Sequence, residues 1–530
     1  MGIVMGLRAA VTAVLLGALW GAAPALAAPA GADAVLPPAI PCAALTGMQI
    51  MPGAVVTKAE AVPAGPTRTG AGAVTPTMLP AYCAIRGMID PRTGADGKAY
   101  GIEFAVNLPD RWNGRFLYQG GGGLNGVVNP PLGVQATGAV PALARGFAVA
   151  SSDSGHKGAG FDRSFMADQQ ASLDFTYGSI GRVSPVAKAV LAHYYARPPA
   201  HSYFAGCSTG GREGMLVTQR FPLEFDGVIA GDPAMRAGHS NLALANAAVA
   251  FNQVAALDPQ TKRPVPGTAL SAADKALVIQ AILAACDRDD GAADGLVSNP
   301  AACRFDPARL TCKAAKADGC LSPGQVQAMK TAFAGPKSAS GRPIYSAFPY
   351  DTGIALETGA IPGFLPSARP SPLGPPNLDL KIDLEAREAA INGDGFQRLQ
   401  DTYFYTNISG FLGHGCRLMM FHGLSDPWFS PLDTVDYFER VGRNNAGAGD
   451  ASRLYLVPGM AHCAGGSSLD RFDLLSALVD WVENGRAPGT IIATGPAFPG
   501  RSRPLCPYPL HAQYKGEGDV EDAANFECRA

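Results

Sequence analysis

The segment SYFAGCSTGGREG, residues 202–214, decides the fold of this chain. Residues 202–206 are typical of a buried strand, a G-x-S-x-G motif around Ser208 follows, and residues 212–220 favour a helix. A strand, a sharp turn and a helix in this order form a nucleophile elbow, which raises a serine hydroxyl onto a helix N-terminus. Because the chain contains 64 glycines, a chance match in a glycine-rich structural turn is the alternative. The strand–turn–helix context favours the elbow.

Short apolar runs that end in turns recur on both sides of the elbow. The runs that we expect to be strands are residues 102–108, 116–118, 147–150, 202–206, 228–230, 417–421 and 454–457. Helical patterns lie between them, as at residues 186–195, and residues 474–482 place apolar side chains on one helix face. Strands that alternate with helices predict an α/β fold whose sheet is at least partly parallel.

Residues 235–405 interrupt this alternation. They contain four of the 11 cysteines, an acidic turn-rich segment and a proline-rich stretch at residues 362–376. Structureless loops rarely reach this length inside a compact domain, so a set of long loops is the weaker interpretation. We therefore predict a sheet-forming core, residues 28–234 and 406–530, with residues 235–405 inserted as a large lid domain.

The first 27 residues have the pattern of a secretory signal peptide. Arg8 precedes an apolar run at residues 9–20, and Ala25-Leu26-Ala27 is a small-x-small cleavage site. The apolar run is shorter than the roughly 20 residues of a membrane span, so a membrane anchor is the weaker interpretation. We expect a secreted or periplasmic protein that forms disulfides and has no membrane association after cleavage.

A serine nucleophile needs a base, and the base needs an acid to orient it. In this fold the chain order is Ser, then Asp or Glu, then His, with each partner after a strand. Asp426 follows the run at residues 417–421, and His462 follows the run at residues 454–457. His422 is the competing histidine, but it precedes Asp426, and we interpret it as a structural hydrogen-bonding residue.

The glycine-rich segment at residues 120–123 follows the expected strand 116–118. In this fold the oxyanion hole combines an N–H from such a loop with the N–H of the residue after the nucleophile, here Thr209. Residues 121–126 also match the dinucleotide motif G-x-G-x-x-G, but no helix start follows them, which excludes that interpretation.

Two cysteines flank the expected catalytic residues. Cys207 directly precedes Ser208, and Cys463 directly follows His462. If Ser208 and His462 lie within hydrogen-bond reach, the two cysteines can approach the Cα separation that a disulfide requires. We therefore expect a Cys207–Cys463 bridge that joins nucleophile and base.

Residues 206–214, 422–427 and 459–463 together resemble the tannase and feruloyl esterase family. The resemblance implies an α/β-hydrolase core with a lid, Ser208, Asp426 and His462 as the triad, and the N–H groups of Gly123 and Thr209 as the oxyanion hole. The disulfides that it implies are Cys207–Cys463, Cys42–Cys83, Cys286–Cys303, Cys312–Cys320 and Cys506–Cys528. Cys416 is then the unpaired thiol, next to a strand and buried.

The family also implies a structural calcium ion in the lid. Asp287, Asp290 and Asp294 cluster with interleaved glycines, a pattern that suits a hard cation with six to eight oxygen ligands. The resemblance adds the backbone carbonyls of Ala292 and Leu296. From the residues alone, an acidic surface turn is the alternative.

The expected function is hydrolysis of esters of aromatic carboxylic acids by an exported serine esterase. Phe429 matches a family position that packs on the aromatic acid, and Phe364 resembles a second substrate contact. Hydrolysis of a terephthalate monoester is an alternative activity, and a catalytically silent hydrolase-fold binding protein is the alternative of another class. With a net charge of −2 and no basic cluster, no nucleic-acid partner is expected. The oligomeric state stays open.

Overall fold

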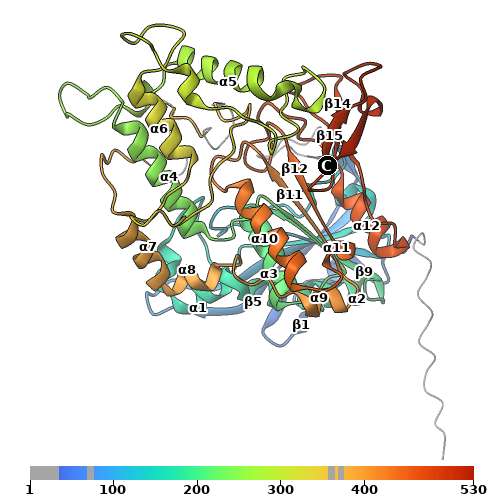
Figure 1. Cartoon of the computed structure of the whole chain (residues 1–530). Coiled ribbons are helices and arrows are strands. Elements are labelled where there is room, and N and C mark those ends of the chain that lie inside the picture. Colours follow the sequence, from blue (N-terminus) through green and yellow to red (C-terminus); the bar gives the residue numbers. More distant parts are fainter. Residues whose placement is uncertain (1–34, 68–76, 356–363, 368–374) are drawn as a thin grey trace, which may run out of the picture.

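A ten-stranded sheet forms the centre of the computed structural model, which describes residues 35–67, 77–355, 364–367 and 375–530 (Figure 1). The strand order is β1-β2-β5-β6-β8-β7-β9-β10-β11-β12. The six strands from β8 to β12 in this order are parallel to one another, and β1, β2, β5 and β6 extend the sheet in antiparallel fashion. The strands are β1 Gln49–Met51, β2 Ala54–Val62, β5 Tyr82–Thr93, β6 Ala99–Pro109, β7 Arg115–Gln119, β8 Ala148–Ser152, β9 His201–Cys207, β10 Gly227–Gly231, β11 Arg417–Gly423 and β12 Ser452–Val457.

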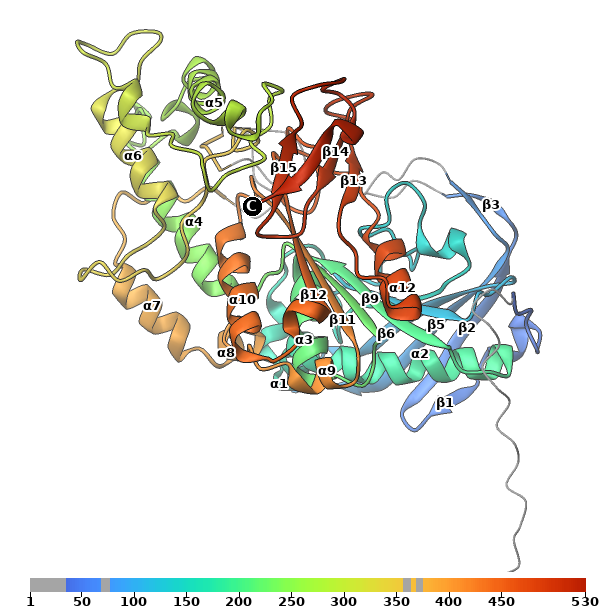
Figure 2. The ribbon, with the colours of Figure 1, turned by 45° about the vertical axis from the view of Figure 1, so that its right-hand side comes forward.

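Both faces of the parallel half are covered by helices, because successive side chains of a strand point to opposite faces. In β11, Leu418 and Met420 pack in one hydrophobic core with side chains of α2, α3 and α10. Met419 and Phe421 pack in a second core with the apolar face of α12 (Figure 2). The helices are α1 Gln169–Leu173, α2 Ser179–Tyr195, α3 Thr209–Arg220, α4 Ala237–Asn252, α5 Ala272–Cys286, α6 Pro323–Phe333, α7 Leu384–Gly393, α8 Gly395–Gln400, α9 Ser409–Gly413, α10 Pro431–Asn444, α11 Ala448–Ala451 and α12 Leu474–Asn484. The predicted α/β-hydrolase fold class is confirmed.

The predicted lid contains a hydrophobic core of its own. Side chains from residues 243–365, including those of α4, α5 and α6, form a third cluster that is separate from the two cores of the sheet. Figures 1 and 2 both show α5 and α6 standing away from the sheet. The limits 235 and 405 stay predictions.

Four short strands near the C-terminus form two hairpins outside the main sheet. Strands β13 Ile491–Thr494 and β14 Ser502–Leu505 pair with each other, as do β15 His511–Tyr514 and β16 Phe526–Arg529. Ala512 and Phe526 of the second hairpin pack on Ala292 of the acidic loop. The C-terminal residues therefore support the loop in which the calcium site was predicted.

Five disulfides join the described cysteines. Their pairings are Cys42–Cys83, Cys207–Cys463, Cys286–Cys303, Cys312–Cys320 and Cys506–Cys528, the same five that the family resemblance implied. Cys416 is free and buried. Disulfides of this number are typical of proteins in oxidising compartments.

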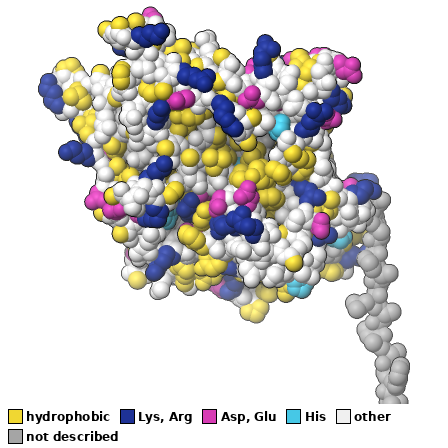
Figure 3. Space-filling model, viewed as in Figure 1, with side chains coloured by type: hydrophobic (Ala, Val, Ile, Leu, Met, Phe, Trp, Pro, Cys, Tyr) yellow, Lys and Arg dark blue, Asp and Glu magenta, His cyan; other side chains and the backbone are white. Residues whose placement is uncertain are grey.

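The described part of the chain contains no helix with the length and hydropathy of a membrane span. The predicted signal peptide, residues 1–27, lies outside the described residues. On the face shown in Figure 3, Lys and Arg side chains are scattered among neutral ones rather than gathered into one patch.

Candidate active site

Ser208 sits at a strained turn between β9 and α3. Its backbone angles are φ 64° and ψ −121°, in a region that non-glycine residues rarely adopt. The flanking glycines permit this turn, since a Cβ on Gly206 would lie 2.5 Å from the carbonyl oxygen of Gly210. A Cβ on Gly211 would lie 2.1 Å from the carbonyl oxygen of Gly231. The strand, turn and helix thus have the geometry of a nucleophile elbow.

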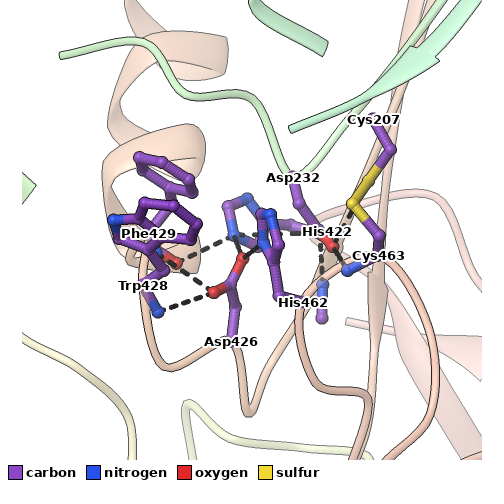
Figure 4. Close-up of a disulfide and its surroundings, with 9 residues drawn as sticks. Cys207, Asp232, His422, Asp426, Trp428, Phe429, His462 and Cys463 are labelled. Atoms are coloured by element: carbon purple, nitrogen blue, oxygen red, sulfur yellow. Dashed lines mark hydrogen bonds and ion pairs between the residues drawn. A yellow bond between two sulfur atoms is a disulfide. The ribbon is translucent and has the colours of Figure 1, made fainter. Parts of the chain in front are cut away.

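Asp426 and His462, the predicted acid and base, are joined by a hydrogen bond. Asp426 lies in the loop after β11, and His462 lies in the loop after β12. Nδ1 of His462 is 2.7 Å from Oδ2 of Asp426 (Figure 4). The other carboxylate oxygen, Oδ1, accepts hydrogen bonds from the backbone N–H groups of Trp428 and Phe429. These two backbone hydrogen bonds hold the carboxylate with Oδ2 facing the imidazole of His462.

The charges of this pair shift both pKa values. Burial alone would raise the pKa of Asp426, but the neighbouring His462 and His422 outweigh it and lower that pKa far below its usual range. Burial alone would lower the pKa of His462, but the charge and hydrogen bond of Asp426 outweigh it and raise that pKa. Asp426 is thus ionised at neutral pH and stabilises the imidazolium that forms when His462 accepts a proton.

A disulfide brings the serine to this pair. The Cα atoms of Cys207 and Cys463 are 5.9 Å apart, and each cysteine is the chain neighbour of Ser208 or His462. Among the described residues, no hydrogen bond joins the Ser208 hydroxyl to His462. Catalytic hydrogen bonds of free enzymes are often long and shorten when substrate binds.

The glycine-rich loop lies beside the start of α3. The Thr209 hydroxyl donates a short hydrogen bond to the carbonyl oxygen of Gly123, which links the two predicted oxyanion residues. Gly123 has φ +56°, and a Cβ there would be 3.2 Å from the carbonyl oxygen of Gly160. Glu213, which sequence reasoning missed, accepts the N–H of Gly121 at 2.8 Å and so fixes this loop to α3. Its position in the helix after the elbow, one turn beyond Thr209, could have indicated that it lies close to the oxyanion loop.

His422 has the structural hydrogen bonds that were expected of it. Its ring is fully buried, with Nδ1 2.8 Å from the Thr434 hydroxyl and Nε2 3.0 Å from the carbonyl oxygen of Phe429. Nε2 is also 3.2 Å from Oδ2 of Asp426. Because Nε2 faces only acceptors, it carries a proton, and His422 supports the acid rather than acting as the base.

Two aromatic rings lie beside His462, and a third ring lies beside one of them. The rings of Phe429 and Trp428 lie 5.4 and 5.7 Å from that of His462, and they stack on each other at 5.1 Å. The ring of Phe161 lies 5.5 Å from that of Trp428. Sequence reasoning missed Trp428 and Phe161, although Trp428 stands only two residues after Asp426.

Phe364 lies in the lid core. It is 8% exposed, and its ring is 4.6 Å from that of Phe333 and 4.5 Å from that of Phe348. The substrate-contact roles of Phe364 and Phe429 stay predictions.

The acidic loop of the lid offers oxygen donors of the kind that calcium prefers. Oδ2 of Asp290 is buried and has no hydrogen-bond partner. Burial, reinforced by the charges of Asp294 and Asp287, raises the pKa of Asp290 to about 6. Oδ2 of Asp294 pairs with the Arg503 guanidinium, and its Oδ1 accepts the N–H of Leu296. A buried, unpartnered carboxylate oxygen among like charges fits a cation site.

The same loop lacks a fully converged ligand set. Among the described residues, the His, Cys, Asp and Glu groups of three or more whose ligand atoms lie within 4.8 Å of one another are at the active site. One of these groups contains Cys207 and Cys463, whose sulfur atoms are joined in a disulfide.

The fold and this site define a carboxylic ester hydrolase of the α/β-hydrolase class. The family model for "Tannase and feruloyl esterase" matches residues 83–367 and 374–529, and the chain belongs to this family. The chain is 39% identical over 523 residues to the mono(2-hydroxyethyl) terephthalate hydrolase of Piscinibacter sakaiensis, with 85% of each chain covered. It is 31% identical over 454 residues to a probable feruloyl esterase of Arthroderma benhamiae, with 79% of this chain and 81% of that one covered.

Solved structures agree with this assignment. The crystal structure of feruloyl esterase B from Aspergillus oryzae matches with a TM-score of 0.73 and 25% identity, covering 90% of this chain and 97% of that one. The tannin acyl hydrolase from Aspergillus niger matches in fold with a TM-score of 0.67 at 22% identity, covering 94% of each chain. The predicted family and enzyme class are confirmed.

Proposed function

We propose that this hydrolase is an exported serine esterase for esters of aromatic carboxylic acids, with Ser208, His462 and Asp426 as its triad. The observation that carries the proposal is the Asp426–His462 hydrogen bond, joined to the strained Ser208 elbow by the Cys207–Cys463 bridge. A catalytically silent binding protein would have no use for a serine held in an unfavourable backbone conformation beside an oriented imidazole.

The reaction follows from these positions. Ser208 Oγ attacks the ester carbonyl carbon while Nε2 of His462 accepts the hydroxyl proton. The N–H groups of Gly123 and Thr209 stabilise the oxyanion. As the intermediate collapses, the bond to the alcohol oxygen breaks, and His462 returns the proton to that oxygen. Water, deprotonated by His462, then attacks the acyl-enzyme and releases the acid and free Ser208.

An aromatic substrate is supported by the rings of Trp428 and Phe429 beside His462 and by the ring of Phe161 beside Trp428. Offset and edge-to-face contacts with such rings favour a flat aromatic acyl group over an aliphatic one. Two relatives are named for feruloyl esters and for a terephthalate monoester, and the acid part of each of these esters is a flat aromatic group. The 39% identity to the terephthalate monoester hydrolase keeps that monoester as a second candidate substrate.

A panel of kcat/KM values tests the substrate class, because specificity is a ratio of these values. The panel compares methyl ferulate, methyl gallate, mono(2-hydroxyethyl) terephthalate and an aliphatic methyl ester. We expect an aromatic ester to exceed the aliphatic one by at least about tenfold. Ser208→Ala should lose activity on all four. Retained hydrolysis by that variant would refute the triad, and equal rates on all esters would refute the aromatic preference.

The acidic loop is proposed to bind a structural calcium ion. Asp287, Asp290 and Asp294 would supply carboxylate oxygens, and Ala292 and Leu296 would supply carbonyl oxygens. When bound, the cation would neutralise the clustered charge and stabilise the contact between the lid and the C-terminal hairpins. Export through a cleaved signal peptide at residues 1–27 is proposed from the sequence pattern and from the five disulfides.

A further inference from the structure

Two buried aspartates outside the proposed triad contact both of the loops that carry Asp426 and His462. We propose that Asp232 and Asp351 are positioning residues for the reaction, because each carboxylate accepts hydrogen bonds from the Asp426 loop and from the His462 loop at once. We call them the loop-bridging carboxylates. This inference rests on the proposed triad and adds two residues to the machinery that orients it.

Asp232 bridges the loops from the core side. It follows β10, is fully buried, and has φ +35°. Its Oδ1 accepts the N–H of Gly423, at the end of β11, at 2.8 Å. Its Oδ2 accepts a short hydrogen bond from the N–H of Cys463, the residue after His462 (Figure 4). Both oxygens accept N–H groups, which favours the ionised carboxylate, while burial raises the pKa of Asp232.

Asp351 bridges the same loops from the lid. It is fully buried, and its Oδ2 accepts the Ser425 hydroxyl at 2.7 Å and the N–H of Gly459 at 2.8 Å. Ser425 directly precedes Asp426, and Gly459 begins the loop that leads to His462. One oxygen of a lid residue therefore contacts both catalytic loops. The other oxygen, Oδ1, is buried without a hydrogen-bond partner.

The lid backbone next to Asp351 also packs closely against both loops. The N–H of Gly353 donates to the Ser425 hydroxyl at 2.9 Å, so this hydroxyl accepts from the lid backbone and donates to the lid carboxylate. A Cβ on Gly353 would be 2.3 Å from the carbonyl oxygen of Gly459 and 2.7 Å from the Ser425 oxygen. Only glycine fits at this position, so the close packing of the lid segment against the catalytic loops depends on the residue that the sequence places there.

The function of these contacts is to set the relative position of acid and base. Neither catalytic loop has regular secondary structure, and a misplacement of about 1 Å at a catalytic group can lower the rate by about 100-fold. Asp232 and Asp351 act through backbone and Ser425 contacts, so they influence where His462 and Asp426 lie without touching substrate.

The two carboxylates respond differently to amide substitution. At Asp351, the carbonyl oxygen of an asparagine can replace Oδ2 and accept both hydrogen bonds. At Asp232, one of the two N–H donors would face the NH2 group of an asparagine, so one hydrogen bond is lost. We therefore expect Asp351→Asn to keep most of the wild-type kcat and Asp351→Ala to lower kcat about 10- to 100-fold with little change in KM. Asp232→Asn should lower kcat as Asp351→Ala does.

The pH profile separates the two residues further. The groups that face His462 are the carboxylates of Asp426 and Asp232, with His422 behind Asp426. Asp232 raises the pKa of His462 by its charge. Asp232→Asn should therefore move the acid limb of kcat/KM to lower pH, whereas Asp351→Asn should leave that limb in place.

The test measures kcat, KM and the pH profile for the wild type and the variants, each checked for folding by circular dichroism and thermal melting. Asp274→Ala is the matched control, since Asp274 is a buried lid carboxylate whose hydrogen bonds go to Ser271, Lys316 and Gln325, away from the catalytic loops. It should lose stability and keep its kcat. If Asp351→Ala does not fold, Ser425→Ala removes one of the two Asp351 hydrogen bonds and should show an intermediate loss of kcat.

Wild-type kcat in Asp351→Ala, or equal kcat values for its alanine and asparagine variants, would overturn the role of Asp351. An unmoved acid limb and full kcat in Asp232→Asn would overturn the role of Asp232. Ser208→Ala is measured alongside: if it stays active, the proposed triad fails. If it is inactive while the loop-bridging variants behave as wild type, the triad stands and this inference fails.

Discussion

Removal of the Cys207–Cys463 bridge should affect stability more than removal of any short-range bridge. The two cysteines are 256 residues apart in sequence, whereas Cys312 and Cys320 are 8 apart. In the chain-entropy model, closing loops of these lengths contributes about 5.5 and about 2.5 kcal/mol to the free energy of unfolding. Replacing Cys207 and Cys463 by alanine should therefore lower the free energy of unfolding by about 3 kcal/mol more than replacing Cys312 and Cys320 by alanine.

Activity should separate the two bridges as well. The double variant at Cys207 and Cys463 still has the hydrogen bonds that Asp232 and Asp351 accept from the two loops, so we expect a loss of about 10- to 100-fold in kcat rather than complete inactivation. The variant of the lid bridge should keep its kcat. Urea unfolding under oxidising conditions measures the stability, and initial rates on methyl ferulate measure kcat. An active-site variant that is no less stable than the lid variant would refute the entropy argument, and one with unchanged kcat would refute the positioning role.

Three further predictions concern pH, calcium and the aromatic rings. His462 must be neutral to accept the serine proton, and Asp426 raises the pKa of His462 against the effect of burial. The value of kcat/KM should therefore be low in acid and rise through an apparent pKa above 6.5. A profile of kcat/KM from about pH 5 to 9 checks this, and an acid limb below 6.5 contradicts it. Chelation by EGTA should lower the melting temperature, because an ion at 100 times its Kd adds about 2.7 kcal/mol to the free energy of unfolding. The kcat of the folded enzyme should stay unchanged, and Asp290→Asn should abolish the effect of EGTA. A melting temperature that does not respond to EGTA argues against the calcium site. Trp428→Ala should raise KM for aromatic esters about tenfold while leaving aliphatic esters little changed, and an equal effect on both would contradict an aromatic contact.

The parts of the structure that local sequence patterns determine were predicted well. The expected strand at residues 202–206 lies within β9, and the helix expected at residues 212–220 lies within α3. The tight turn at Ser208 requires glycines on both sides because a Cβ there would clash, so the G-x-S-x-G motif predicts the geometry of the turn. The triad partners could be proposed because each follows a strand whose apolar run is visible in the sequence.

The loop-bridging carboxylates could not be predicted in this way. Asp232 precedes a proline, and Asp351 lies in an irregular lid segment, so both resemble ordinary turn aspartates. Their roles depend on which N–H groups face them after the chain has folded, and those groups are about 70 to more than 200 residues away in sequence. The hairpins β13 to β16 were missed for a different reason. Their strands are only four residues long, the shortest length over which alternation indicates a strand.

The place where the lid is inserted explains how a lid residue can support the triad. The lid leaves the sheet after β10, directly beyond Asp232, and the chain returns at β11, whose end leads to Asp426. In parallel strands these ends meet at one edge of the sheet, which is also where β12 delivers His462. A lid that emerges at this edge can fold its own backbone onto both catalytic loops, as Gly353 does. The insertion therefore contacts both loops and, on the proposed triad, contributes to the geometry of the acid and base. Changes in lid packing near Asp351 should for this reason appear in kcat, whereas changes in a lid that served only as a cover would appear in KM.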